Sequence, residues 1–317
     1  MIKPILVTGY VNPDLDAVAG SMAYSEFLIK KGIECIVGFL GEPHEEAKYI
    51  LNRFNIKYPE QIENDANFEK VILVDASDLT GLENRINPDK VIEIIDHRKV
   101  NEADKFTNAK VQIELVGSAC TLVAEKFIEN KVNISKDSAI LLCGAIISNT
   151  LNFKNKGVTT ERDIKAFKYL NEIALLPIDF KKDLFESKSD LSGDKLKERI
   201  MGDLAWFNLS GKRVSIAQLE IVNSNKIISN RVDEIIDIFN EIKKDLKLDY
   251  IFLNLIELED EKNFIITDDI ELQSILEKIL NIKFESNLAI RNELIMRKQI
   301  VPLFKDELEK IINKDIK

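Results

Sequence analysis

Short apolar runs rich in β-branched residues alternate with helical patterns through the first half of this 317-residue chain. The runs at 2–9, 35–40, 71–74 and 91–95 have the near-continuous apolar character of strands that are buried on both faces. After the first run, residues 17–31 space their apolar side chains by three and four, as a helix does. This alternation predicts an α/β domain with a mainly parallel sheet covered by helices.

The pattern changes after Pro177. Residues 186–194 form the most polar, loop-like stretch in the middle of the chain, and we expect the domain boundary there. Strand-like alternation returns at 213–222, and a last helix is expected near 303–313. The sequence therefore predicts three segments, which are an N-terminal domain at 1–187, a linker at 188–194 and a smaller α+β domain at 195–317.

Charge and composition exclude several classes of protein. The formal net charge is −10, which argues against a nucleic-acid partner. The longest apolar run, 139–148, is too short to span a bilayer, and the N-terminus lacks the plan of a signal peptide. Cys35, Cys120 and Cys143 lie in apolar stretches without metal-ligand spacing, as buried thiols do in a reducing compartment. We expect a cytoplasmic protein with neither a membrane nor a nucleic-acid partner.

Acidic residues follow the predicted strands at the edge where open α/β sheets bind their ligands. Asp14 and Asp16 come after the first strand, Asp75 follows the run at 71–74, and Asp96 and His97 follow the run at 91–95. The chain has only two histidines, so a metal site must consist mainly of carboxylates. Such donors suit Mn²⁺, Mg²⁺ or Co²⁺, and a cation would offset the repulsion among the carboxylates.

Each of these acids also has an ordinary structural interpretation. A single aspartate after a strand is usually a turn residue or a helix cap, and residues 12–16 would serve as a turn followed by an N-cap. Helix caps and turns do not readily explain why acids occur at several strand ends at once, together with His97. The pattern as a whole therefore favours a metal or phosphate site.

A series of short motifs runs through nearly the whole chain. In order they are GYVNPDLDAV, LVDASD, IIDHRKV, VGSACTLVAEKF, AIISNTLNFK, TTERD, DLAWFNLSGKRVSIAQLEIV and MRKQIVP. In this order and spacing they make the chain resemble the family II (manganese-dependent) inorganic pyrophosphatases of the DHH phosphoesterase superfamily. The resemblance implies a DHH domain, a DHHA2 domain, an active site in the cleft between them, and a homodimer formed through the N-terminal domain.

The resemblance also implies a set of metal ligands. Asp14 and Asp16 match the two aspartates of the first motif, and Asp75 matches the aspartate shared by two metal ions. His97 matches the first histidine of the DHH motif, which is a metal ligand. Asn149 stands where the family has its last metal-binding aspartate, and it can offer only a neutral carbonyl oxygen.

The match implies catalytic roles for Asp14, Asp75 and Arg98 and phosphate contacts for Arg98, Arg297 and Lys298. Arg98 replaces the second histidine of the motif, so it can bind phosphate but cannot donate a proton at neutral pH. The same triplet occurs in Prune-like relatives, and the alternative is that Arg98 only pairs with a neighbouring acid. Four positions depart from the family, namely Tyr10 and Ala76 in place of histidines, Asn149 in place of an aspartate, and Ala205 in place of a lysine.

Three functional hypotheses follow. The first is metal-dependent hydrolysis of a phosphoanhydride, foremost pyrophosphate, with activity reduced by the missing ligands. The second is a catalytically impaired protein that binds or senses a phosphate ligand. The third is a phosphoesterase for an oligophosphate or another phosphoester, because Ala76 and Ala205 leave room and remove charge.

Overall fold

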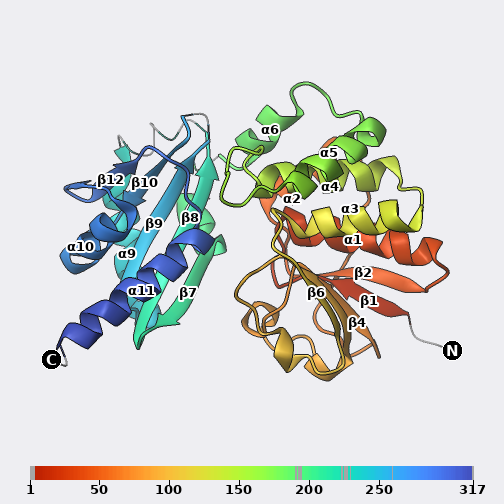
Figure 1. The fold of residues 1–317 in the computed structure, drawn as a ribbon, viewed down its shortest axis with the longest axis horizontal. Coiled ribbons are helices and arrows are strands. Elements are labelled where there is room, and N and C mark those ends of the chain that lie inside the picture. The colour runs from red at the N-terminus through yellow and green to blue at the C-terminus, as the bar shows by residue number, and fades with distance from the viewer. Residues whose placement is uncertain are drawn as a thin grey trace. The chain divides into compact units, whose positions relative to one another are not determined.

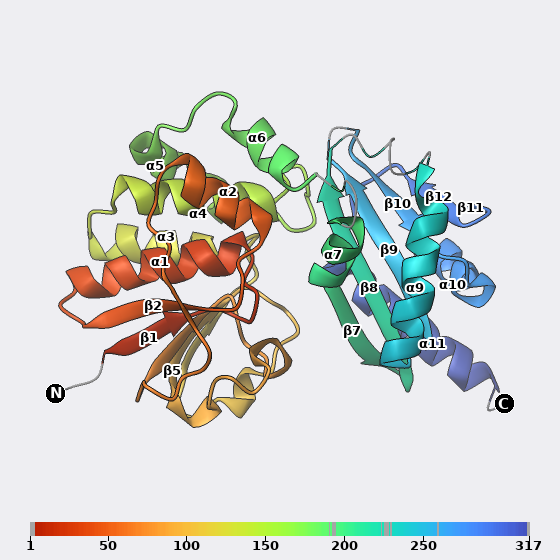
Figure 2. The same cartoon turned by 180° about the vertical axis from the view of Figure 1, so that it is seen from behind.

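The computed structural model describes residues 4–189, 191, 195–222, 224, 228, 230–258 and 260–315. The chain divides into two compact units, 1–187 and 188–317, which are shown from two sides in Figures 1 and 2. Much of the predicted linker, residues 190 and 192–194, lies outside the described residues.

The first unit contains a six-stranded sheet in which every pair of neighbours is parallel, as predicted. Its strands are β1 (Ile5–Thr8), β2 (Cys35–Leu40), β3 (Glu60–Ile62), β4 (Val71–Val74), β5 (Val91–Asp96) and β6 (Lys110–Ile113). Their order is β3-β2-β1-β4-β5-β6, so the direction of strand addition reverses between β1 and β4. The carboxyl ends of strands at such a reversal are the usual position of a ligand site in this class of sheet.

The helices of the first unit lie on one side of the sheet (Figure 1). They are α1 (Leu15–Lys30), α2 (Glu45–Arg53), α3 (Ala119–Asn130), α4 (Lys136–Asn149), α5 (Glu161–Ala174) and α6 (Phe180–Ser187). Loops and three short 3-10 turns cover the opposite face, where Phe68, Leu82 and Phe106 pack against Leu6 and Leu73 of the strands. Both faces are therefore buried, although helices cover only one of them.

The second unit contains a six-stranded sheet with helices packed on both faces. The strands are β7 (Leu204–Leu209), β8 (Lys212–Ile221), β9 (Tyr250–Glu257), β10 (Lys262–Ile266), β11 (Phe284–Glu285) and β12 (Leu288–Arg291), in the order β11-β12-β10-β9-β8-β7. Only β8 and β9 are parallel neighbours among these described strands.

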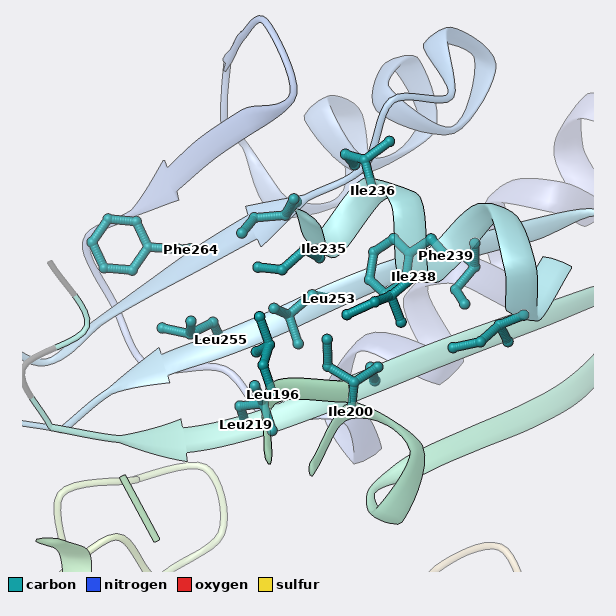
Figure 3. Close-up of a cluster of buried hydrophobic side chains, with 14 of the residues drawn as sticks. Leu196, Ile200, Leu219, Ile235, Ile236, Ile238, Phe239, Leu253, Leu255 and Phe264 are labelled. Carbon is teal, nitrogen blue, oxygen red and sulfur yellow. The ribbon is translucent and has the colours of Figure 1, made fainter. Parts of the chain in front are cut away.

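Two separate apolar clusters stabilise this second sheet. On one face, α7 (Lys195–Gly202) and α9 (Val232–Leu246) bury side chains such as Ile200 and Phe239 against Leu253 and Leu255 (Figure 3). On the other face, α10 (Ile270–Leu280) and α11 (Arg297–Asp315) pack on β9 and β10. The α+β character expected for this part of the chain is confirmed.

Two predicted boundaries were wrong. Residues 186 and 187, expected in a loop, end α6, because Phe180 and Leu184 form a buried helical face. The last helix begins six residues before the expected position at 303. Its buried side chains Ile300 and Phe304 continue the same face across Pro302, which costs one backbone hydrogen bond near the helix start.

Two expectations from composition can be compared with the structure. Cys35, Cys120 and Cys143 are buried and free, as predicted. Among the helices within the described ranges, none combines the length and apolar character that crossing a membrane requires.

The half-buried carboxylate of Glu26 joins α1 to the start of α4. Glu26 accepts hydrogen bonds from the Ser135 amide and hydroxyl (2.7 and 2.6 Å), from the Ser138 hydroxyl (2.5 Å) and from Lys30 (2.6 Å). Burial by itself would raise the pKa of Glu26, but these donors lower it below its ordinary value. The ionised form of Glu26 therefore stabilises the fold.

Replacing this carboxylate tests its contribution. We expect Glu26→Gln to lower the free energy of unfolding at pH 7 by about 1–3 kcal/mol, because the hydroxyl, amide and ammonium donors lose their charged acceptor. Because the pKa of Glu26 is lower in the folded state, its contribution is present above the unfolded pKa of about 4.3 and disappears as the pH falls through the folded pKa. Urea unfolding at pH 7 and pH 3.5 checks both statements, and an equal difference between wild type and variant at the two pH values would contradict them.

Candidate metal centre

Three side chains from separate segments converge beyond the carboxyl ends of β1, β4 and β5. They are Asp16 of α1, Asp75 directly after β4 and His97 directly after β5, and one donor atom of each lies within 4.8 Å of the others. His97 Nε2 is 3.4 Å from Asp75 Oδ1 and 3.6 Å from Asp16 Oδ2. The sequence predicted that these three residues would meet, and the strand reversal between β1 and β4 explains where.

The N-terminus of α3 fixes the carboxylate of Asp16, which is completely buried. Oδ1 accepts from the Ser118 hydroxyl (2.7 Å) and the Cys120 amide (3.0 Å), and Oδ2 accepts from the Ala119 amide (2.9 Å). Amide groups at a helix N-terminus favour a negative charge. Ser118 also caps α3, so one serine serves both the helix and the site.

A second buried aspartate holds the segment that leads into α3. Asp163 accepts the Gly117 amide with both oxygens (3.0 and 2.9 Å) and the Thr121 hydroxyl (2.6 Å). It also completes the capping box of α5 with Thr160. A Cβ at Gly117 would lie 2.6 Å from Thr150 Cγ2, so this close approach needs glycine.

Asp75 adopts a conformation that is unusual for a residue with a side chain. Its φ angle is +58°, in the left-handed region, and its amide donates to the Ile95 carbonyl (2.8 Å). The residue is 2% exposed, and within the described part of the chain Oδ1 has no hydrogen-bond partner. Burial raises the pKa of Asp75 to about 7, against the lowering effect of Arg98. A buried, unsatisfied oxygen of this kind is costly unless a cation meets it.

The hydrogen bond of His97 determines which ring nitrogen faces the carboxylates. Nδ1 lies 2.9 Å from the Val116 carbonyl oxygen, which can only accept, so Nδ1 carries the proton. In the neutral ring, Nε2 then directs its lone pair toward Asp16 and Asp75. Two carboxylates and a lone pair at these distances repel one another, and a divalent cation would remove that repulsion.

Asp14 and Asn149, which the sequence suggested as further ligands, have other partners. Asp14 caps α1 by accepting the Ala17 amide (3.0 Å), and burial, then Asp16, raise its pKa. Asn149, at the end of α4, donates its amide to Asp16 Oδ2 (2.5 Å). In this orientation the asparagine presents nitrogen to the site, so it holds Asp16 instead of offering an oxygen to a cation.

The two histidines expected from the family are replaced by residues with structural contacts. Tyr10 uses its hydroxyl to accept the Asp14 amide (3.1 Å), and burial and the nearby Asp14 raise its pKa well above its ordinary value. Ala76 is 1% exposed and packs in the apolar cluster below the sheet. Neither position therefore supplies a metal ligand in this structure.

Arg98 lies beside Asp75 and is held by several groups. Nη1 donates to Asp78 Oδ2 (3.1 Å) and Nη2 to the Asp75 carbonyl (2.8 Å), while the guanidinium carbon lies 5.2 Å from the centre of the Tyr10 ring. Asp96 accepts the backbone amides of His97 (2.6 Å) and Arg98 (3.3 Å) and the Ser77 hydroxyl. Sequence reasoning gave Asp78 no role, although its position three residues after Asp75 was visible.

The predicted phosphate contacts Arg297 and Lys298 begin α11 in the second unit. Arg297 donates to the Asp203 carboxylate (2.6 Å) and carbonyl (2.7 Å), and its amide donates to the Gln218 side chain (2.6 Å). Ala205, where the family has a lysine, lies half-buried in β7. The guanidinium of Arg297 is thus already engaged with the start of β7.

Buried amides in the second unit fix the segment before α11. Asn263 donates to the Ile295 carbonyl (2.7 Å) and accepts the Ile295 amide (3.0 Å), while Asn254 donates to the same carbonyl (2.9 Å). Gln218, which accepts the Arg297 amide, also accepts from Asn254 (3.3 Å). These contacts give the basic pair at 297 and 298 a rigid support.

Both halves of the chain match models of known protein domains. Residues 4–146 match the family model for the DHH family, N-terminal domain, and residues 182–307 match the model for the DHHA2 domain. The chain is 31% identical over 313 residues to a protein of Exiguobacterium sp. named "Probable manganese-dependent inorganic pyrophosphatase". That match covers 98% of this chain and the whole of the relative.

Further relatives bear the same name. A Bacillus cereus protein is 30% identical over 321 residues, which cover 97% of this chain and all of the relative. A solved structure of a candidate family II inorganic pyrophosphatase from Methanococcus jannaschii superposes with a TM-score of 0.77 at 28% identity, over 96% of this chain and 99% of that one. With both domains present and in this order, the chain belongs to the family II inorganic pyrophosphatases of the DHH superfamily.

Proposed function

We propose that this protein hydrolyses inorganic pyrophosphate to phosphate with the help of bound Mn²⁺. The observation that carries the proposal is the unsatisfied Oδ1 of Asp75, buried opposite the lone pair of His97 and the carboxylate of Asp16. The names of the full-length relatives support manganese as the metal and pyrophosphate as the substrate.

The residues present fit a divalent ion of this type. Two carboxylate oxygens and one imidazole nitrogen are a donor set that Mn²⁺ accepts, and Mg²⁺ or Co²⁺ are chemically related choices. Each donor is oriented by a further contact, since Asp16 is held by α3, Asp75 by its backbone and His97 by the Val116 carbonyl. Preoriented ligands of this kind lower the reorganisation needed for binding.

When bound, a divalent ion supplies a Lewis acid that polarises phosphate oxygens and activates water. The residues of the chain supply orientation and charge around it. Arg98 remains protonated, because Asp75 and Asp96 raise its pKa against the effect of burial, and its side chain is 31% exposed. It can therefore bind a phosphate oxygen and neutralise charge on the leaving phosphate, but it cannot act as a general acid.

The departures from the family pattern bear on the rate. Tyr10, Ala76 and Asn149 remove two imidazoles and one carboxylate from the neighbourhood of the ion, and Ala205 removes an ammonium group. We propose that activity is lower than a complete ligand set would give, because ligand charge sets metal affinity. Arg297 and Lys298 are proposed as additional phosphate contacts, with Arg297 exchanging part of its pairing with Asp203 for the substrate.

Two other functions are distinguished by one substrate panel. A protein that only senses phosphate ligands would bind pyrophosphate without releasing phosphate from any compound. A phosphoesterase for larger substrates would prefer tripolyphosphate, long-chain polyphosphate or a phosphoester. Phosphate release from each compound with Mn²⁺, Mg²⁺ and Co²⁺ separates these cases, and a clear preference for pyrophosphate supports the proposal.

Removing the carboxylate of Asp75 tests the proposal directly. We expect Asp75→Asn to reduce Mn²⁺-dependent phosphate release from pyrophosphate by at least about a thousandfold, since a lost metal contact costs several kcal/mol of transition-state stabilisation. Asp104→Asn, a change at an exposed aspartate of the same unit, is the matched control and should retain full activity. Equal rates for the two variants would contradict the proposed role of Asp75.

Asn149 gives a test in the opposite direction. We expect Asn149→Asp to raise Mn²⁺ affinity by about tenfold or more, because it adds a charged oxygen ligand beside Asp16. Without metal, the same change places two carboxylates in contact and should lower the free energy of unfolding by about 1–3 kcal/mol. Calorimetric titration with Mn²⁺ and thermal unfolding with and without metal measure the two effects, and lower affinity for Mn²⁺ would refute the expectation.

A further inference from the structure

The two oxygens of the Asp75 carboxylate face different kinds of neighbour. Oδ1 is buried opposite Asp16 and His97 and has no hydrogen-bond partner among the described residues. Oδ2 lies 3.5 Å from Nη2 of Arg98, which is a permanent cation. A positive charge is therefore missing on the first side and already supplied by the chain on the second.

Arg98 is fixed in this position from several directions. Its Nη1 donates to Asp78 and its Nη2 to the Asp75 carbonyl, and its Nε lies 3.8 Å from Asp96 Oδ1. The flat guanidinium also lies over the Tyr10 ring, with 5.2 Å between the guanidinium carbon and the ring centre, which adds a cation–π contact. A guanidinium with this many contacts is a built-in part of the site, and its 31% exposure leaves part of it accessible to a ligand.

The groups around Oδ2 do not form a second set of metal ligands. Tyr10 is a neutral phenol whose hydroxyl already accepts the Asp14 amide. Asp14 accepts the Ala17 amide as the cap of α1, and Asp78 is paired with Arg98. A metal ion beside Oδ2 would also meet the repulsion of the Arg98 guanidinium at short range.

We infer that the site takes one divalent ion per chain, and that Arg98 serves as its second positive group, on the opposite side of Asp75. A phosphate ligand would then be held between an exchangeable metal cation and a fixed organic cation. Among the described residues, Asp16, Asp75 and His97 are the one group that can hold the ion, which agrees with this stoichiometry. The inference rests on the proposed function for its use of Mn²⁺, but it concerns the number of ions and the role of Arg98.

Counting the ions tests the first part. Metal-free protein is titrated with Mn²⁺, the bound metal is measured by elemental analysis after removal of free ions, and the electron paramagnetic resonance spectrum is recorded. We expect one Mn²⁺ per chain with the resolved hyperfine pattern of an isolated ion. Two ions per chain with a spin-coupled spectrum would overturn the inference and leave the proposed function intact, whereas no bound ion would overturn the proposed function as well.

Substitution of Arg98 tests the second part without relying on turnover. In Mn²⁺-loaded protein, we expect Arg98→Gln to weaken binding of the non-hydrolysable anion imidodiphosphate at least tenfold while the stoichiometry stays at one Mn²⁺. Arg98→Lys keeps the charge and should retain most of the affinity for imidodiphosphate. A folded Arg98→Lys variant also shows that replacing the arginine does not by itself unfold the protein. Arg85→Gln, at a partly exposed arginine of the same unit that lies 3.7 Å from Glu83, is the control and should change neither quantity.

The outcomes separate a ligand-binding Arg98 from a structural one. If Arg98→Gln binds imidodiphosphate as tightly as the wild type, Arg98 is only an ion-pair partner of Asp75 and Asp78, and the inference fails. If Arg98→Lys loses as much affinity as Arg98→Gln while remaining folded by circular dichroism, a positive charge alone is not what the ligand recognises, and the assigned role is again wrong.

Discussion

Two carboxylates and an imidazole lone pair face one another at distances that are repulsive without a cation between them, and the first unit is built to keep them there. Asp16 is held by the amides of α3, and His97 is oriented by the Val116 carbonyl. Asp75 occupies a left-handed backbone conformation at the end of a buried strand. The free energy for holding these groups together comes from the helix, the strands and the packed core around them, so the site is prepared before any ligand arrives.

The fold was largely predictable because its central strands are apolar on both faces. Four of the six strands in the first sheet, β1, β2, β4 and β5, match continuous runs of β-branched and other apolar residues. The edge strands β3 and β6 were not predicted, because their Glu, Gln and Lys side chains leave no continuous apolar run. Their pairing depends on the neighbouring strand and not on a pattern of their own.

The sequence predicted those residues of the candidate site whose positions follow from the ends of predicted strands. Asp75 directly follows one predicted strand and His97 lies two residues beyond another, so parallel topology alone brings them to one edge. Asp14 caps α1, as an aspartate after a strand ordinarily does, and its role as a further metal ligand stays a prediction. The contact between Tyr10 and Arg98 could not be foreseen, because it joins two loops whose separation in space no local pattern specifies.

The capping box of α5 has a consequence that reaches beyond its own helix. Asp163 accepts hydrogen bonds from the Gly117 amide and the Thr121 hydroxyl. The segment between these two residues carries the α3 amides that donate to Asp16. Loosening the first turn of α5 would thus be transmitted through the Asp163–Gly117 hydrogen bonds, the short chain segment 117–119 and the hydrogen bond from Ala119 to Asp16, which is the proposed metal ligand on α1. A side chain that looks like an ordinary helix cap therefore also helps to fix the carboxylate at the heart of the candidate metal centre.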